Sequence, residues 1–301
     1  MRPAGIGSPR LATVPESREA RPAAAAATAG PAPRPQDAFE RGSREVQGPA
    51  LPQDPAPEPV DGRQWMQDAL EDIKTRVANG ENVKVVFDLD DTIWDGRPRT
   101  VELAHRYDAE HGTHLFDGLA LDQVGKDGFE TAVNAGLSRS DAKAFNSYWK
   151  SRVYTDEMAQ FDAPMPEIDS LAQQAHDAGA QVVYLTGRPE AERETTRGEL
   201  QRLGLPGADD AHLIMKPTLN QPTADYKVAE LKKMLEPGDT HIGWFITESR
   251  RDLGAVQDAK LDVPTVLLDA PWERNGRPLD PSTPIYPSQV GVADDQVLWA
   301  A

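Results

Sequence analysis

Two aspartates separated by a single residue are the first residues in this chain that could carry chemistry. Asp88 and Asp90 lie at the end of the β-prone run 83–88. One such carboxylate can attack the phosphorus atom of an ester, and a second acid can serve as a proton donor. The pair therefore indicates nucleophilic phosphoryl transfer, provided that other groups hold the phosphate and offset its charge.

The groups that could hold a phosphate follow later β-prone runs. A cation is needed among them, because two like unit charges 4 Å apart repel by about 4 kcal/mol at an effective dielectric near 20. Hydroxyl and amide donors would bind the phosphate oxygens, and acids could hold a divalent metal. The candidates are Thr186, Gly187 and Arg188 after the second run, Lys216 ending the third, Lys227 soon after it, and Glu248 with Asp252 after the fourth.

Five short β-prone runs must position these side chains, and each is followed by a helical pattern. This alternation predicts an α/β fold with three layers, in which a Rossmann-like parallel sheet has helices on both faces. Ligands of such sheets bind beyond the carboxyl ends of the strands, so the candidates should meet at one edge. Pro189 is expected to open the helix after the second run. The runs cover residues 83–88, 181–186, 212–216, 241–247 and 265–269.

The segment between the first two runs is far longer than a crossover helix needs. Apolar residues recur at helical spacing in residues 100–110 and 140–154. We expect a helical cap at residues 97–162, inserted into a core made of residues 63–96 and 163–285. For Tyr148 and Trp149 in this cap, the spacing favours burial of a helix face over stacking on a base.

The two ends of the chain are expected to lie outside these domains. Residues 1–60 contain 12 of the 26 prolines and few large apolar side chains. Such a segment buries too little surface to offset the entropy lost on ordering. We therefore expect a disordered tail at residues 1–62 and a second tail at residues 286–301.

Composition excludes several classes of protein. The net charge is −17, and it falls on residues 61–301 because the first 60 residues hold seven acidic and seven basic side chains. An acidic surface disfavours nonspecific binding to nucleic acid. The chain has no cysteine, which excludes a cysteine nucleophile and fits a reducing compartment. No apolar run approaches the length of about 18 residues of a membrane span, and no secretory pattern is recognisable, so we expect a cytoplasmic protein.

Four segments together resemble the motifs of the haloacid dehalogenase-like (HAD) superfamily of hydrolases. They follow the order found in that family and extend over about residues 82–270. The segments are Phe87-Asp88-Leu89-Asp90-Asp91-Thr92, Tyr184-Leu185-Thr186-Gly187-Arg188, Tyr226-Lys227 and Ile246-Thr247-Glu248-Ser249-Arg250-Arg251-Asp252. The resemblance implies a HAD-like core, with the long insert as a mobile cap over the site.

The resemblance also implies a role for most of the candidates. Asp88 would form an aspartyl-phosphate while its other oxygen binds Mg²⁺. Asp90 would protonate the leaving group, activate water and offer its backbone carbonyl to the metal. The remaining roles would be phosphate binding by Thr186, Gly187 and Lys227, and metal binding by Glu248 and Asp252.

Asp90 favours a phosphatase over a dehalogenase, because a leaving alkoxide needs a proton and a leaving halide does not. The expected substrate is a small phosphorylated metabolite. Nucleotides are one candidate, since residues 265–272 are similar to the segment that follows the fourth motif in nucleotide-cleaving members. Lys216 remains the alternative to Lys227 as the phosphate-site lysine. Arg188 either touches the substrate or pairs with Glu190 or Glu192.

The fourth motif departs from the family pattern, which usually begins Gly-Asp and here reads Thr247-Glu248. A longer carboxylate still offers oxygen to Mg²⁺, so we expect activity with an altered metal geometry. The departure motivates an alternative function, in which the chain is a non-catalytic phosphoacceptor, an Mg²⁺-binding module or an interaction protein with a degenerate site.

Overall fold

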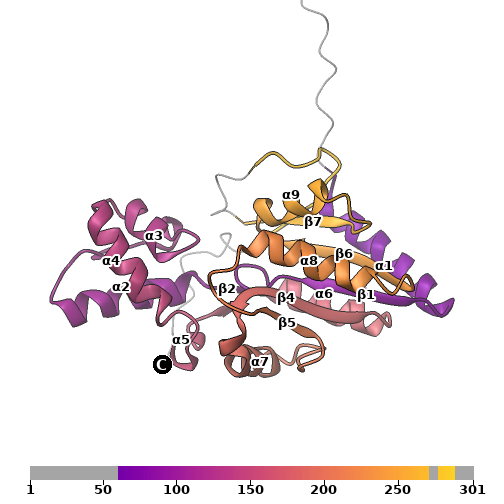
Figure 1. Ribbon diagram of the computed structural model, residues 1–301, viewed down its shortest axis with the longest axis horizontal. Coiled ribbons are helices and arrows are strands. Elements are labelled where there is room, and N and C mark those ends of the chain that lie inside the picture. Colours follow the sequence, from indigo (N-terminus) through magenta and orange to yellow (C-terminus); the bar gives the residue numbers. More distant parts are fainter. Residues whose placement is uncertain (1–59, 271–276, 289–301) are drawn as a thin grey trace, which may run out of the picture. The chain divides into compact units, whose positions relative to one another are not determined.

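The computed structural model describes residues 60–270 and 277–288 of the 301-residue chain. Six parallel strands form the main sheet in the order β5-β4-β1-β6-β7-β8 (Figure 1). All five expected runs lie in this sheet, so the predicted α/β class is confirmed. The strands are β1 (Asn82–Phe87), β4 (Gln181–Pro189), β5 (Leu213–Lys216), β6 (Thr240–Thr247), β7 (Thr265–Asp269) and β8 (Ile285–Pro287).

Helices cover both faces of the sheet. Successive residues of a strand point to opposite faces, so Phe87 packs in one hydrophobic cluster with α1 and α6, while Val86 packs in another with α8 and α9. Figure 1 shows α8 and α9 in front of the sheet and α6 behind it. The helices are α1 (Gly62–Ala78), α6 (Pro166–Asp177), α7 (Arg193–Arg202), α8 (Thr223–Leu235) and α9 (Arg250–Asp258).

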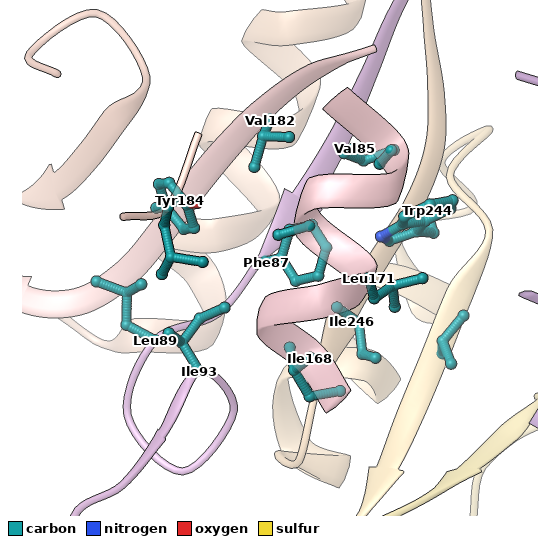
Figure 2. Packing of buried hydrophobic residues seen from close by; sticks show 14 of the residues in the cluster. Val85, Phe87, Leu89, Ile93, Ile168, Leu171, Val182, Tyr184, Trp244 and Ile246 are labelled. Carbon is teal, nitrogen blue, oxygen red and sulfur yellow. The ribbon is translucent and has the colours of Figure 1, made fainter. Parts of the chain in front are cut away.

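Phe87 anchors the end of β1 in the first cluster. Its ring meets Trp244 edge to face, with centroids 6.1 Å apart, and lies 6.4 Å from the ring of Tyr184. Figure 2 shows Leu171 of α6 beside these rings. Truncating a buried aromatic side chain to alanine typically costs about 3–5 kcal/mol, so this packing holds the last residue of β1, and the residue after it, in a fixed place.

The segment between β1 and β4 forms a helical unit with its own hydrophobic cluster. Tyr107, Phe116 and Phe145 meet edge to face or tilted in this cluster, and both Tyr148 and Trp149 are buried in it. The elements are α2 (Arg97–His111), the 3₁₀ turn η1 (Leu121–Gln123), α3 (Gly128–Asn134), α4 (Arg139–Lys150) and α5 (Asp156–Ala159).

Two very short strands flank this unit and were not expected from the sequence. β2 (Trp94–Asp95) precedes α2, β3 (Ala163–Pro164) follows α5, and the two pair antiparallel. Two residues per strand are too few to show any alternation of polarity. The pairing brings together the chain segments that enter and leave the insert.

Three local details differ from the sequence-based expectation. Gly62, assigned to the N-terminal tail, is the first residue of α1. Tyr286 and Pro287, assigned to the C-terminal tail, lie in β8, which pairs with β7. Pro189 does not open a helix, because β4 continues through it; a 3₁₀ turn, η2 (Glu190–Glu192), follows, and α7 begins at Arg193.

Some expectations lie outside the described residues. These are the disordered tail up to residue 59, residues 289–301 of the C-terminal tail, and residues 271 and 272 of the segment similar to nucleotide-cleaving members. Within residues 60–270 and 277–288, no helix has the length and apolar character to cross a membrane.

Candidate active site

The carboxyl ends of β1, β4 and β6 lie side by side, because β1 pairs with both of the other strands. Asp88 directly follows β1, and its amide donates to the carbonyl of Ile246 in β6 at 3.0 Å. Thr186 lies in β4 and Thr247 ends β6. The parallel register therefore brings together polar residues that are up to 159 positions apart in the chain.

A tight turn follows Asp88. The amides of Thr92 and Ile93 both donate to the carbonyl of Leu89, at 3.0 and 2.8 Å. Asp91 occupies the left-handed region with a φ of 58°, a conformation that aspartate tolerates better than most residues. The turn brings the hydroxyl of Thr92 within hydrogen-bond reach of the end of β6, where it donates to Glu248.

Asp88 is buried, with 5% of its surface exposed, and both of its carboxylate oxygens accept hydrogen bonds. Its Oδ2 accepts from Nζ of Lys227 at 2.5 Å and from the hydroxyl of Thr247 at 2.7 Å. Its Oδ1 accepts from the Leu89 amide at 2.8 Å. Burial raises the pKa of Asp88; Lys227 opposes this shift and Asp252 adds to it.

Lys227, in the first turns of α8, joins two carboxylates. Besides Asp88, its ammonium donates to Asp252 at 2.7 Å, and the side chain is 2% exposed. Burial alone would lower the pKa of Lys227, but Asp252 and Asp88 raise it above its ordinary value, so this residue stays charged. The N-cap Ser249 accepts from the Asp252 amide and thereby sets Asp252 in the first turn of α9.

Lys216, the alternative candidate for the phosphate-site lysine, makes its hydrogen bonds to the loop after β5. Its ammonium donates to the carbonyls of Leu219 and Gln221, at 3.2 and 3.0 Å, and to the hydroxyl of Thr223 at 3.0 Å. These contacts tie the loop between β5 and α8 to the end of β5. Of the two lysines, Lys227 is therefore the one that contacts Asp88.

Asp90 is held by two arginines. Arg188 donates through Nη2 to Oδ1 at 2.8 Å and through Nε to Oδ2 at 3.0 Å. Arg99 donates to Oδ1 at 2.8 Å, and the indole of Trp94 does so at 3.2 Å. Burial alone would raise the pKa of Asp90, but Arg188 and Arg99 lower it well below its ordinary value. The carboxyl group thus has a fixed orientation and carries a charge.

Arg188 forms ion pairs that the sequence did not predict. The sequence offered contact with the substrate, or pairing with Glu190 or Glu192. Arg188 is fully buried and pairs with Asp90 and with Glu199 of α7, whereas Glu190 pairs with Arg193. The backbone reason is that β4 extends through Pro189, which keeps Arg188 inside the sheet and away from the exposed turn at Glu190.

Thr186 and Gly187 lie in β4 beside β1. The hydroxyl of Thr186 accepts from the Arg188 amide at 3.1 Å, and Thr186 is fully buried. A Cβ atom at Gly187 would come within 3.1 Å of the Thr223 methyl group, so a side chain there would crowd the N-terminus of α8. Neither residue contacts Asp88 directly through a described hydrogen bond.

Glu248 completes a group of acids at the end of β6. Its Oε2 is within hydrogen-bond distance of the hydroxyls of Thr92 and Thr247, at 2.9 and 3.0 Å. Burial raises the pKa of Glu248 well above its ordinary value, and the nearby charges of Asp88 and Asp91 add to this shift. The carboxylates thus outnumber the one buried ammonium of Lys227, and this negative excess favours a cation.

The chemistry of this donor set fits a hard divalent cation, since Asp88, Glu248 and Asp252 offer carboxylate oxygens, the ligands that Mg²⁺ prefers. In the described part of the chain, however, no group of three or more such side chains has the spacing of a completed metal site. Two of these three acids, Asp88 and Asp252, pair with the ammonium of Lys227.

A cavity of about 40 Å³ lies where Asp90 faces the cap. Burial raises the pKa of Asp91 at its edge to about 7, with Asp95 and Asp90 contributing. Tyr154 is half-buried, and its ring lies 5.0 Å from the guanidinium of Arg188. The other lining residues from the insert include Arg99, Lys126 and Trp149.

The sequence analysis did not predict several residues that contact the candidate site residues. Thr247 was noted only as a departure from the motif, and its contact with Asp88 follows from the pairing of β1 with β6. Arg99 and Asp162 had no local signal, because they lie 63 positions apart and meet only through the folding of the insert.

The parallel sheet, the inserted helical unit and the acids at the strand ends define a HAD-like hydrolase. A family model described as "HAD superfamily, subfamily IIIB (Acid phosphatase)" matches residues 127–267. The match includes Thr186, Lys227, Glu248 and Asp252 and begins after Asp88. Over this stretch, just under half of the chain, the sequence is similar to the acid phosphatases of the HAD superfamily.

Solved structures of this superfamily resemble the chain at low identity. A haloacid dehalogenase-like hydrolase from Streptococcus pneumoniae is 13% identical, with a TM-score of 0.48, over 69% of this chain and 94% of that one. A HAD-superfamily hydrolase from Geobacter sulfurreducens is 15% identical (TM-score 0.44; 64% and 91%). A class C acid phosphatase from Bacillus anthracis with tungstate bound is 14% identical (TM-score 0.37; 76% and 78%). No curated protein matches the chain.

Proposed function

We propose that this phosphatase is an Mg²⁺-dependent phosphomonoester hydrolase that acts through an aspartyl-phosphate on Asp88. The observation that carries the proposal is the buried contact of Asp88 with Lys227 at the carboxyl end of β1. A nucleophilic carboxylate must meet an anionic phosphate, and the ammonium of Lys227 reduces the repulsion between them.

In the first step, an oxygen of Asp88 forms a bond to phosphorus and the ester P–O bond breaks. The electron pair of the broken bond leaves with the alcohol oxygen, which takes a proton from Asp90. The step starts from protonated Asp90, so Asp90 must gain a proton against the effect of Arg188 and Arg99 before it reacts. In the second step, water gives a proton to Asp90 and attacks phosphorus, the bond to Asp88 breaks, and phosphate is released. Asp88 and Asp90 return to their initial states.

The phosphate would be held by the groups at the end of β4. The Thr186 hydroxyl already accepts from the Arg188 amide, so its own proton can go to a phosphate oxygen. The amide of Gly187 is the second donor, and the lack of a side chain there keeps the approach to Thr223 open. Lys227 would hold the phosphate and Asp88 together.

Asp88, Glu248, Asp252 and the backbone carbonyl of Asp90 would hold Mg²⁺. Bound there, the ion would supply positive charge against the transferring phosphoryl group. Glu248 is held by the hydroxyls of Thr92 and Thr247 and so lies beside Asp88. The excess of buried acids over cations in this group supports the assignment.

The substrate is proposed to be a small phosphorylated metabolite, with nucleotides as one candidate. The narrow cavity at Asp90, lined in part by the insert, supports a small leaving group. The net charge of −17 disfavours a nucleic-acid substrate. The absence of cysteine supports a reducing compartment, and hence the cytoplasm, as the place of action.

The test is Mg²⁺-dependent hydrolysis of 4-nitrophenyl phosphate by the wild type and by Asp88→Asn. Removing the nucleophile should lower kcat by roughly 10³-fold or more, while Asp122→Asn, an exposed acid of the insert, should leave it unchanged. Equal rates for the wild type and Asp88→Asn would contradict the mechanism. A folded, Mg²⁺-binding wild type without turnover would favour the non-catalytic phosphoacceptor or binding module.

A further inference from the structure

The cavity beside Asp90 has a basic lining, although the whole chain carries a net charge of −17. It is formed by the turn after β1 and by the insert, and its volume is about 40 Å³. Positive charge on the wall of a cleft attracts anions, so this lining favours a ligand with a negative charge. The charged residues of the lining are the basic Arg97, Arg99 and Lys126 and the acidic Asp90 and Asp91.

Lys126 differs from the two arginines of this cavity because no acid matches its charge. Arg97 pairs with Asp95 at 2.7 Å, and Arg99 pairs with Asp90 at 2.8 Å. For the ammonium of Lys126, the residues that the structure describes provide no ion pair and no hydrogen bond. A bound anion can therefore pair with Lys126 without breaking a contact within the protein.

The backbone of Lys126 is held at the cavity by the start of α3. Its amide donates to Oε2 of Glu130 at 3.1 Å, and the amide of Gly125 donates to the hydroxyl of Thr131, also at 3.1 Å. A Cβ atom at Gly125 would lie 2.4 Å from Cγ of Glu130, so this close approach needs glycine. The long side chain of Lys126 thus starts from a fixed point beside the cavity.

Two hydroxyl groups supply further hydrogen-bond donors to the cavity. Thr100 is 4% exposed, and its oxygen accepts from the indole of Trp149 at 3.1 Å, which leaves its own proton for a ligand. The hydroxyl of Tyr154 makes no hydrogen bond to the described residues. Burial raises the pKa of Tyr154, so this hydroxyl keeps its proton. An ionised carboxylate offers acceptors only, and so matches these two hydroxyls and the ammonium of Lys126.

The size of the cavity limits what can enter it. One water molecule requires about 10–15 Å³ of such space. The cavity of about 40 Å³ therefore accepts a group of the size of a carboxylate, and a nucleobase is much larger. Among the candidate substrates, this size favours a small acid over a nucleotide.

We propose that this cavity binds a carboxylate of the leaving group, and that the substrate class is phosphomonoesters of small hydroxy acids. Lys126 pairs with the carboxylate, and the hydroxyls of Thr100 and Tyr154 donate to it. The repulsion from Asp90 is reduced because Arg188 and Arg99 match its charge. The inference rests on the proposed function, which places the leaving oxygen beside Asp90.

The test compares two esters of nearly the same shape that differ in charge, 2-carboxyethyl phosphate and its amide, 2-carbamoylethyl phosphate. We expect the wild type, with Mg²⁺, to have a kcat/KM that is about 10-fold or more higher for the acid, because hydrogen bonds to a charged group are stronger than those to a neutral one. Equal values for the two esters, or a preference for the amide, would overturn the proposal.

Lys126→Met should remove most of this preference. The loss should appear mainly as a higher KM for the acid, because the ion pair stabilises the bound substrate and the transition state alike, and turnover of the amide should change little. Lys126→Arg keeps the charge and should keep the preference. Lys143→Met removes an exposed lysine of α4 that does not line the cavity, and should also keep it. Full preference in Lys126→Met, or its loss in Lys143→Met, would overturn the proposal.

Binding to Asp88→Asn separates this inference from the proposed function, since this variant should hold either ester without consuming it. Isothermal titration calorimetry should give a Kd about 10-fold lower for the acid than for the amide. Equal affinities would overturn the carboxylate site. If the wild type turns over neither ester nor 4-nitrophenyl phosphate while the binding preference persists, the proposed function fails and the carboxylate site stands.

Discussion

The hydroxyl of Thr247 lies 2.7 Å from Oδ2 of Asp88, across the pairing of β6 with β1. The contact occurs at the position where the fourth motif departs from the family pattern. The same hydroxyl lies 3.0 Å from Glu248. A single threonine thus touches both the proposed nucleophile and the acid proposed to bind the metal.

Replacing Thr247 by valine should lower kcat/KM for 4-nitrophenyl phosphate about 10-fold or more, because a hydrogen bond to a charged group is worth about 1.5–3 kcal/mol. Valine has nearly the same shape, so the fold should persist. Thr247→Ser keeps the hydroxyl and is the matched control. Equal loss in both variants would assign the effect to packing and not to the hydrogen bond.

Glu248→Gln should weaken Mg²⁺ binding, measured by isothermal titration calorimetry, by roughly tenfold or more, because it removes one negative ligand from a hard cation. Glu248→Asp keeps the charge and should recover part of the affinity. Unchanged affinity in Glu248→Gln would show that Glu248 is not a ligand of the metal.

Substitution of Lys227 should mainly reduce activity, whereas substitution of Lys216 should mainly reduce stability. Lys227→Met leaves the buried acids Asp88 and Asp252 without a cation, and should abolish measurable turnover of 4-nitrophenyl phosphate. Lys216→Met leaves the carbonyls of Leu219 and Gln221 without their donor. It should lower the free energy of unfolding by about 1–3 kcal/mol while most of the turnover remains.

Turnover retained in Lys227→Met and lost in Lys216→Met would reverse the assignment of the phosphate-site lysine. The free energy of unfolding is obtained from urea titration at a fixed pH. The kinetic measurement uses the protein fraction that remains folded, so that a loss of stability is not read as a loss of catalysis.

Asp169 of α6 should make the protein less stable as the pH rises. Burial raises the pKa of Asp169 to about 7, and its buried Oδ1 has no hydrogen-bond partner. In the unfolded chain an aspartate loses its proton near pH 4. Between about pH 4 and 7 the folded state therefore retains a proton that the unfolded state releases, and the free energy of unfolding falls over this interval.

Asp169→Asn removes this pH dependence. Because the side chain is partly exposed, we expect a gain on the order of 1–2 kcal/mol at pH 8 and little change at pH 4.5, measured as Tm by calorimetry. Asp122→Asn is the control, since this acid is exposed. A gain of the same size at both pH values would contradict the role of ionisation.

The local patterns predicted most of the fold. All five β-prone runs form strands, because a short run of apolar and β-branched residues is visible within six or seven positions. β2, β3 and β8 were missed, because strands of two or three residues carry no such signal. Pro189 was assigned to a helix start, whereas backbone pairing with Lys216 in β5 keeps it in β4.

By itself, the sequence determined which acids, lysines and hydroxyl groups follow the strands, and therefore which edge of the sheet they share, since parallel strands place their carboxyl ends together. Only the tertiary structure decided which of these groups touch. It paired Lys227 and not Lys216 with Asp88, and it placed Arg188 and Arg99 on Asp90. Such contacts depend on how the insert and distant strands pack, which no local pattern of residues encodes.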